Sequence, residues 1–161
     1  LSAIYSFKGE YFSQGSSYEN QLTPRTYGHF WQTKKGIKNM ALTFNNNKLE
    51  TLKQSPVEKE TIRLNIFDIH QTDDPLTSFI KIMMGEKSTL VVDGRRYYRM
   101  KATPNHNKNQ TTVEVLNYFN LWADHKRNKF EKIIFEKKTK GLLPSKMFIH
   151  FDGRVFRLEE Y

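Results

Sequence analysis

The sequence predicts an all-β fold, mainly antiparallel, with about 8–10 strands and one short helix. Most of the chain alternates apolar with polar residues, the period-2 pattern of half-buried strands. Turn-forming residues separate these segments at short intervals, whereas a parallel sheet would need long crossover connections. At 161 residues, the chain is long enough to bury a core without the cysteines that it lacks. We therefore expect one domain, 1–161, built as a barrel or a sandwich.

The single clear helical pattern lies near 75–84. Asp74 suits the N-cap, Pro75 suits the first helical position, and Gly85 should end the helix. One face of this helix is apolar and carries Leu76, Phe79, Ile80 and Met83. A helix of this length is marginal alone in water, so we expect this face to dock on the β core and cap its open end.

The strands on the N-terminal side of the helix should form two hairpins in series, followed by one more strand. Alternating segments lie at 4–12, 27–33, 39–44, 48–54 and 62–66. The composition of 14–17 predicts a loop after the first strand. The asparagines at 45–47 tolerate left-handed conformations and predict a turn.

After the helix, Asp93-Gly94 predicts a tight hairpin, because Asp-Gly suits the positive φ angles of a type I′ turn. A two-residue turn would pair Leu90 with Tyr97 and place Val92 opposite Arg95. Polar residues at 104–110 predict a loop, and strands are expected around Val113 to Leu121 and around Ile133.

The last hairpin has the clearest pattern in the chain. Met147 and Ile149 alternate with polar or opposite-facing residues up to Asp152-Gly153, and apolar residues return after that turn. A two-residue turn pairs Ile149 with Phe156 and Met147 with Leu158 on one face.

No set of residues predicts catalysis. The histidines are far apart, with no helical H-x-x-x-H spacing and no acidic partner that completes a metal triad: His29, His70, His106, His125 and His150. The chain also lacks a G-x-S-x-G elbow and a glycine-rich phosphate loop. We therefore predict no catalytic residue, no metal site and no cofactor, and we do not expect an enzyme.

The net charge of +9 favours anionic partners. Basic residues concentrate between 126 and 140 in a candidate anionic-surface site: Lys126, Arg127, Lys129, Lys137, Lys138 and Lys140. They could bind an anionic glycan, lipopolysaccharide or membrane, or they could simply keep the surface solvated. The basic and aromatic run 95–99 fits strand alternation and lacks the glycine and phenylalanine pattern of an RNA-recognition motif, so nucleic acid is not the expected partner.

The aromatic content of 14% favours an internal cavity, because large rings can surround a small ligand inside a barrel of about eight strands. The alternative is an interior that is packed solid. Alternation nominates a set of inward residues: Tyr11, Trp31, Phe44, Leu90, Tyr97, Phe119 and Ile149, with Phe79 and Met83 closing one end. The expected ligand is a small apolar or amphiphilic molecule.

Three short motifs carry a resemblance: Asp74-Pro75-Leu76-Thr77, the 93–94 hairpin, and Gly-Leu-Leu-Pro-Ser-Lys at 141–146. The chain resembles an uncharacterised family of secreted or periplasmic bacterial proteins. The resemblance implies a lipocalin-like barrel that carries small apolar molecules. Gly9-Glu10-Tyr11 stands where lipocalins have Gly-x-Trp, and Arg154 or Arg157 could pack over that ring. The mid-chain helix departs from the lipocalin order, in which the main helix follows the last strand.

The expected location follows from the same resemblance. A signal peptide should have been removed upstream of Leu1, and the mature protein should be secreted or periplasmic. No apolar run is long enough to span a bilayer. We expect a monomer.

Overall fold

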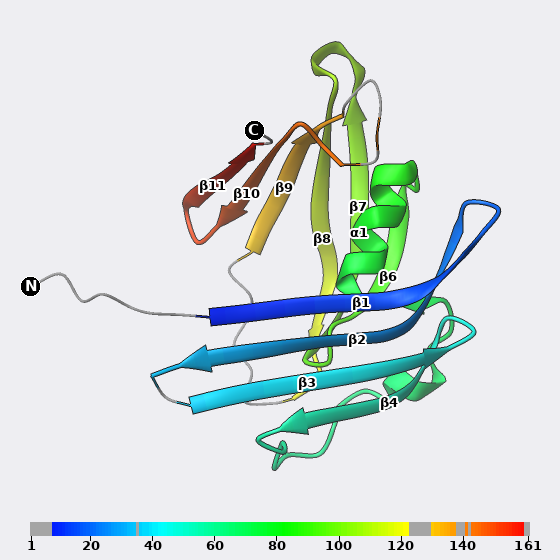
Figure 1. Ribbon diagram of the computed structural model, residues 1–161, viewed down its shortest axis with the longest axis vertical. Helices are drawn as coiled ribbons and strands as arrows, with labels where there is room; N and C mark the ends of the chain where they lie inside the picture. The colour runs from blue at the N-terminus through cyan, green and yellow to red at the C-terminus, as the bar shows by residue number, and fades with distance from the viewer. Residues whose placement is uncertain (1–7, 35, 123–129, 138–140, 142, 160–161) are drawn as a thin grey trace, which may run out of the picture.

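The computed structural model describes residues 8–34, 36–122, 130–137, 141 and 143–159. Within these ranges the chain forms eleven strands and one α-helix, which confirms a mainly antiparallel all-β class. The first sheet holds the first four strands in chain order (Figure 1). These are β1 (Lys8–Tyr18), β2 (Gln21–Thr33), β3 (Gly36–Asn45) and β4 (Lys48–Ser55).

The second sheet holds the other seven strands in the order β11-β10-β9-β8-β7-β6-β5. Their bounds are β5 (Thr72–Asp73), β6 (Ser88–Val92), β7 (Arg96–Asn105), β8 (Gln110–Asn120), β9 (Phe130–Glu136), β10 (Lys146–Phe151) and β11 (Arg154–Glu159). Among the strand pairs of the described residues, only β5–β6 is parallel. Helix α1 (Pro75–Met84) connects β5 to β6, which gives the parallel pair the long crossover that it needs. Two 3₁₀ helices complete the elements: η1 (Ile66–Asp68) and η2 (His106–Lys108).

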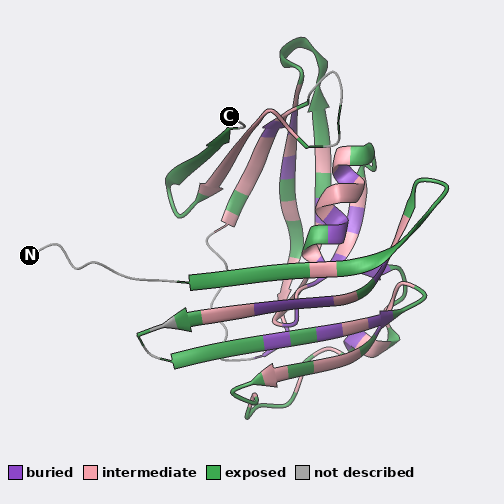
Figure 2. Cartoon of the chain, in the orientation of Figure 1, coloured by how far each residue is buried: buried purple, intermediate pink, exposed green. Residues whose placement is uncertain are grey.

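The two sheets join on one side and remain apart on the other. The amide N of Thr72, at the start of β5, donates a hydrogen bond to the Asn47 carbonyl beside β4 at 2.8 Å. On the opposite side, β1 and β11 are the outer strands of their sheets, and most of their residues are exposed (Figure 2). The described strands therefore form two sheets with an open side and no closed barrel.

Two apolar clusters hold these elements together. The first cluster joins the inner face of the first sheet to the segment 62–69 and to one end of the second sheet; its buried members are Tyr27, Met40, Leu42, Phe44, Leu49, Ile66, Val92, Leu121 and Trp122. The second cluster lies between α1 and the second sheet; its buried members are Ile82, Val91, Tyr98, Met100, Val113 and Phe135. Because neighbouring residues on a strand face opposite sides, Val91 and Val92 belong to different clusters.

Helix α1 begins and ends where the sequence predicts. The Asp74 carboxylate accepts hydrogen bonds from the amides of Leu76 and Thr77, and Gly85 takes the left-handed conformation that ends the helix. The buried face is rotated from the predicted one, because Ile82 and Ser78 are buried whereas Leu76 is 36% exposed. The helix packs against both sheets. On the β1 side the Thr77 hydroxyl meets the Ser13 hydroxyl, so polar residues take part in the buried face, and the apolar pattern alone does not reveal this.

Two predicted elements differ from the structure. Strand β1 continues through 14–17 instead of ending there, with a bulge at Gln14 and Gly15 and the turn at Glu19-Asn20. A Cβ on Gly15 would lie 2.2 Å from the Thr23 carbonyl oxygen, so this glycine allows two strands to approach closely. The segment 62–66 is not a strand. Ile66 is buried in the first cluster, and Ile62 and Leu64 pack against it partly buried, without a partner strand in the described part of the chain.

The predicted strand register is correct for one Asp-Gly hairpin and wrong for the other. The last hairpin has the predicted register, with Ile149 opposite Phe156. In the β6–β7 hairpin, Val92 pairs with Tyr97 and Leu90 with Arg99, so the predicted pairing is wrong by two residues although the faces are unchanged. The Asp93 carboxylate accepts hydrogen bonds from the amides of Arg95 and Arg96 at 2.8 and 2.7 Å, which produces a longer turn.

Candidate ligand-binding hollow

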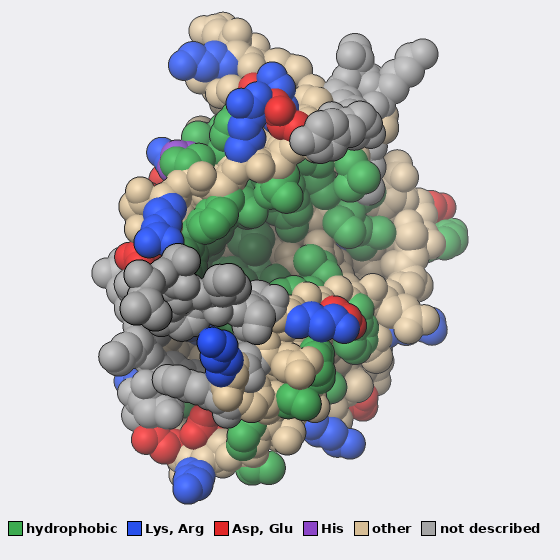
Figure 3. Space-filling view, turned by 60° about the vertical axis from the view of Figure 1, so that its left-hand side comes forward, with side chains coloured by type: hydrophobic (Ala, Val, Ile, Leu, Met, Phe, Trp, Pro, Cys, Tyr) green, Lys and Arg blue, Asp and Glu red, His purple; other side chains and the backbone are tan. Residues whose placement is uncertain are grey.

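The open side of the molecule contains a hollow whose walls carry hydrophobic side chains (Figure 3). We call it the intersheet hollow. Because the open side lies between β1 and β11, we take as its two walls the inner face of β1–β2, with Tyr11, His29 and Trp31, and the α1-facing side of β10–β11, with Ile149, Phe156 and Leu158.

The first-sheet wall is a row of three neighbouring rings, tilted or edge to face toward one another. Tyr11 lies opposite His29 in the β1–β2 register, with ring centroids 5.7 Å apart. Trp31 follows His29 on the same face at 5.8 Å, and Tyr11 meets Trp31 edge to face at 6.2 Å. The period-2 alternation of β2 brings these rings to one side of the sheet. Tyr11 remains 49% exposed because it lies on the outer strand.

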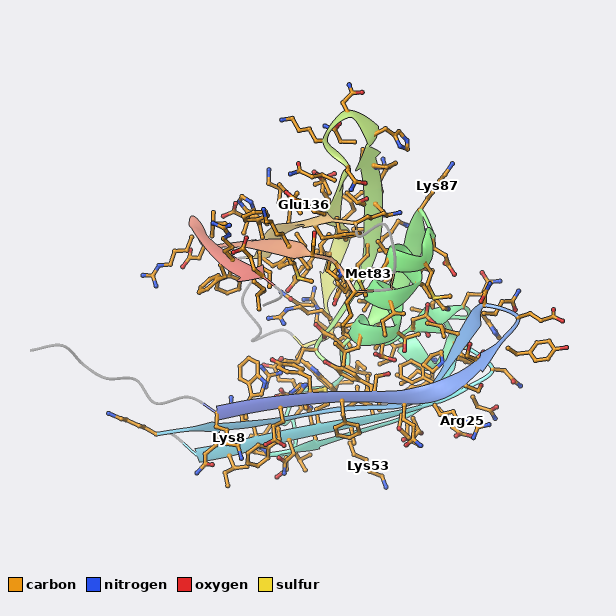
Figure 4. The ribbon with its side chains drawn as sticks, turned by 45° about the horizontal axis from the view of Figure 1, so that its top comes forward. Lys8, Arg25, Lys53, Met83, Lys87 and Glu136 are labelled. Carbon is orange, nitrogen blue, oxygen red and sulfur yellow. The ribbon has the colours of Figure 1, made fainter. Side chains whose placement is uncertain are left out.

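The second-sheet wall continues the face that α1 covers. Ile133 and Met147 pack against the second cluster beside Phe79 and Met83 of the helix. Figure 4 shows Met83 pointing from α1 toward the second sheet. Ile149 pairs with Ile133 on one side and with Phe156 on the other, so these three share this face. The helix does not reach β11, and Phe156 and Leu158 are each 52% exposed.

The tip of the β6–β7 hairpin meets the first sheet between these walls. A Cβ on Gly94 would lie 1.7 Å from the Met40 sulfur, so the bare backbone of Gly94 packs directly on the inner face of β3. The next residue, Arg95, places its guanidinium 5.8 Å from the centre of the Trp31 ring, within range of a cation–π interaction. The Trp122 indole N–H donates to the Gly94 carbonyl at 3.3 Å and fixes the tip.

Burial controls the protonation of this region. Burial, together with the positive charge of Arg95, lowers the pKa of His29 to about 4, so this ring is neutral at pH 7. Burial raises the pKa of Tyr11, Tyr27 and Tyr98, and their hydroxyls stay protonated. Burial also raises the pKa of Asp93, although Arg96 at 3.8 Å and two backbone amides oppose that change. The first-sheet wall is therefore neutral and aromatic, with a cation at its base.

The nine predicted cavity residues fall in four places. Tyr11 and Trp31 belong to the first-sheet wall, with ring centroids 6.2 Å apart, and Ile149 belongs to the second-sheet wall, opposite Phe156. Phe44 is buried in the first cluster. Phe79 and Met83 lie beneath α1 in the second cluster, where Phe79 meets Phe135 edge to face at 5.8 Å. The other three lie on the opposite face of the second sheet, toward 62–69: Leu90, Tyr97 and Phe119.

The predicted basic surface falls mostly outside the described residues. This holds for Lys126, Arg127, Lys129, Lys138 and Lys140. Lys137 is described and exposed, and its backbone exchanges hydrogen bonds with Asn109.

Sequence reasoning missed His29, Arg95, Phe156 and Leu158 as members of the site. His29 shares a predicted face with Trp31, and Phe156 and Leu158 share one with Ile149, so the alternation already contained these three. No local pattern points to Arg95, because its contact with Trp31 depends on how the two sheets meet.

Comparison with protein-family models, with curated proteins and with solved structures found no match for this chain. Among the described residues, no three His, Asp or Glu side chains gather closely enough to hold a metal ion. No helix in the described part of the chain is both long and apolar enough to cross a membrane.

Proposed function

We propose that this protein binds a small hydrophobic or amphiphilic molecule in the intersheet hollow. The observation that supports this proposal most is the pair of half-exposed apolar side chains on β11, Phe156 and Leu158, which extend the α1-facing side of the second sheet beyond the helix. Apolar side chains gathered in a concave region are typical of ligand sites, whereas single exposed ones are ordinary.

The opposite wall suits the same kind of ligand. Its three rings offer faces and edges at different angles, and the neutral state of His29 avoids the desolvation of a charge when an apolar molecule enters. The open side between β1 and β11 gives such a molecule a way in. A carrier role like that of the lipocalins, in a secreted or periplasmic setting, remains part of the proposal.

The test uses the uncharged fluorescent probe N-phenyl-1-naphthylamine, whose emission rises in apolar surroundings. We expect saturable binding, displacement of the probe by decanol, and at least a fivefold weaker affinity in Phe156→Ser. Val155→Ser is the matched control, because Val155 is the next residue on β11, is 56% exposed and faces the other side of the sheet. Equal affinity in the two variants, or no saturable binding by the wild-type protein, would contradict the proposal.

A further inference from the structure

A polar cleft of about 310 Å³ lies where the ends of β3 and β4 meet the β6–β7 hairpin. Three cationic residues line it: Lys38 from β3, Lys59 from the segment after β4, and Arg95 from the hairpin tip. The same walls supply neutral hydrogen-bonding side chains, Gln54 and Ser55. Chain segments far apart in sequence thus bring three positive charges to one concave place.

Positive charge is in excess in the cleft, whose wall holds three cationic residues and one acidic residue, with Asp93 acting on Arg95 from the same hairpin. None of Lys38, Lys59 and Arg95 forms a salt bridge there. The one acidic residue in the wall, Glu58, accepts a hydrogen bond from the Lys59 backbone amide at 3.0 Å. The Nε of Arg95 is buried and has no hydrogen-bond partner in the described part of the chain. A buried guanidinium donor without a partner is rare, because buried polar groups are nearly always satisfied.

Arg95 also connects the cleft to the intersheet hollow. Its guanidinium lies over Trp31, which belongs to the first-sheet wall of the hollow, and Trp31 pairs with Lys38 across β2 and β3. An elongated molecule could therefore place an apolar tail among the rings and an anionic end among the cations. A guanidinium binds phosphate and carboxylate oxygens in a two-pronged geometry, and the lysines add charge.

We infer that this cleft binds the anionic group, phosphate or carboxylate, of an amphiphile whose tail occupies the hollow. The inference of a tail rests on the proposed function, whereas the anion site itself stands on the cleft and its three cations. Its chemistry could equally serve a free phosphate ion, and the experiment separates the two sources.

Isothermal titration calorimetry at low salt compares decyl phosphate, below its micelle concentration, with decanol and with inorganic phosphate. We expect decyl phosphate to bind at least tenfold more tightly than decanol, and Arg95→Gln to abolish this preference while decanol binding persists. Because Arg95 also contacts Trp31, a second variant uses only exposed residues, Lys38→Gln with Lys59→Gln. That double variant should weaken decyl phosphate binding several-fold.

The matched control removes two positive charges elsewhere, Arg25→Gln with Lys53→Gln, and should leave the preference unchanged. Both residues are exposed, and Figure 4 shows Lys53 extending away from the second sheet. If inorganic phosphate alone binds and Arg95→Gln abolishes that binding, the anion site is supported with a free ion as its source. Phosphate binding of this kind would support the anion site even if neither decyl compound binds. The failure of both decyl compounds to bind would contradict the proposed function. Equal affinities for decyl phosphate and decanol, unaffected by Arg95→Gln, overturn the inference and leave the proposed function intact.

Discussion

At the scale of single residues, Asp74 links the helix to the first sheet. Its buried carboxylate accepts hydrogen bonds from the Leu76 and Thr77 amides, from the Thr77 hydroxyl at 2.6 Å and from the Ser13 hydroxyl at 2.9 Å. The last of these reaches across to β1. One side chain therefore caps α1 and positions it beside the open side of the molecule.

Replacing Asp74 tests this dual role. Asp74→Ala leaves several buried donors without an acceptor, so we expect the free energy of unfolding to fall by about 2–3 kcal/mol in urea denaturation. Glu114→Ala, at an exposed position on β8, should change it by less than about 0.5 kcal/mol. A loss below about 1 kcal/mol for Asp74→Ala would show that the carboxylate has neither role.

His29 should make stability depend on pH. Its pKa is about 4 in the folded protein against an ordinary value of 6.5, so the unfolded chain binds a proton over a range where the folded protein does not. The free energy of unfolding should therefore fall by up to about 3 kcal/mol as the pH decreases from 6.5 to 4, and should be unaffected by this residue above that range.

The variant His29→Gln isolates this effect from other titrating groups. The difference in unfolding free energy between wild type and variant should change between pH 7 and pH 4 by about the amount attributed to His29. The exposed His106 supplies the control position for the same substitution, His106→Gln. A constant difference for His29→Gln across this pH range would mean that the ring is not shielded from water.

At the scale of elements, the β6–β7 hairpin tip is the joint between the two sheets. Gly94 has a φ of +85° and has no room for a side chain beside Met40. Gly153, in the last hairpin, has a φ of +71° and open space around it. The two Asp-Gly turns therefore share a backbone requirement and differ in packing.

We expect Gly94→Ala to lower the free energy of unfolding by about 3 kcal/mol, because strain at positive φ adds to displacement of the Met40 side chain. Gly153→Ala should lower the free energy of unfolding by only about 1 kcal/mol, because it adds backbone strain without a clash. Thermal and urea unfolding of both variants measure the difference. Similar losses would place the hairpin tip away from the first sheet.

Local signals predicted the elements whose geometry is local. The Asp74 cap, the Gly85 end of α1 and the register of the last hairpin were all correct, because each depends on a few adjacent residues. The strand predicted at 62–66 was wrong, since its alternating residues pack on the first cluster without strand pairing. The predicted β6–β7 register was also wrong, because the Asp93 carboxylate accepts hydrogen bonds from two backbone amides and lengthens the turn.

The candidate site could be predicted only in part, because it depends on how the two sheets pack against each other. Alternation correctly places Tyr11, His29 and Trp31 on one face of the first sheet, and the last hairpin places Ile149 with Phe156. It cannot say which of the two faces of the second sheet meets the first sheet's rings. Tyr97 and Tyr98 are both aromatic neighbours on β7, yet they belong to different clusters.

At the scale of the whole molecule, the open side is the place where we propose that a ligand binds. The two sheets join through Thr72 and Asn47, whereas the outer edges of β1 and β11 have no partner strand among the described residues and leave the hollow open. The clusters beneath α1 and beneath the hairpin tip are packed with apolar side chains. We therefore propose that an apolar guest binds outside them, between the two walls of the hollow and beside Trp31.

The emission of Trp31 tests that claim most directly. The chain has two tryptophans, and Trp122→Phe leaves Trp31 as the single indole. We predict that decanol shifts this emission to shorter wavelength in a saturable manner, with the same half-saturation as displacement of N-phenyl-1-naphthylamine, and that it protects the indole from iodide quenching. Unchanged emission and unchanged iodide quenching across a panel of apolar ligands, in a variant that circular dichroism shows to be folded, would contradict binding in the intersheet hollow.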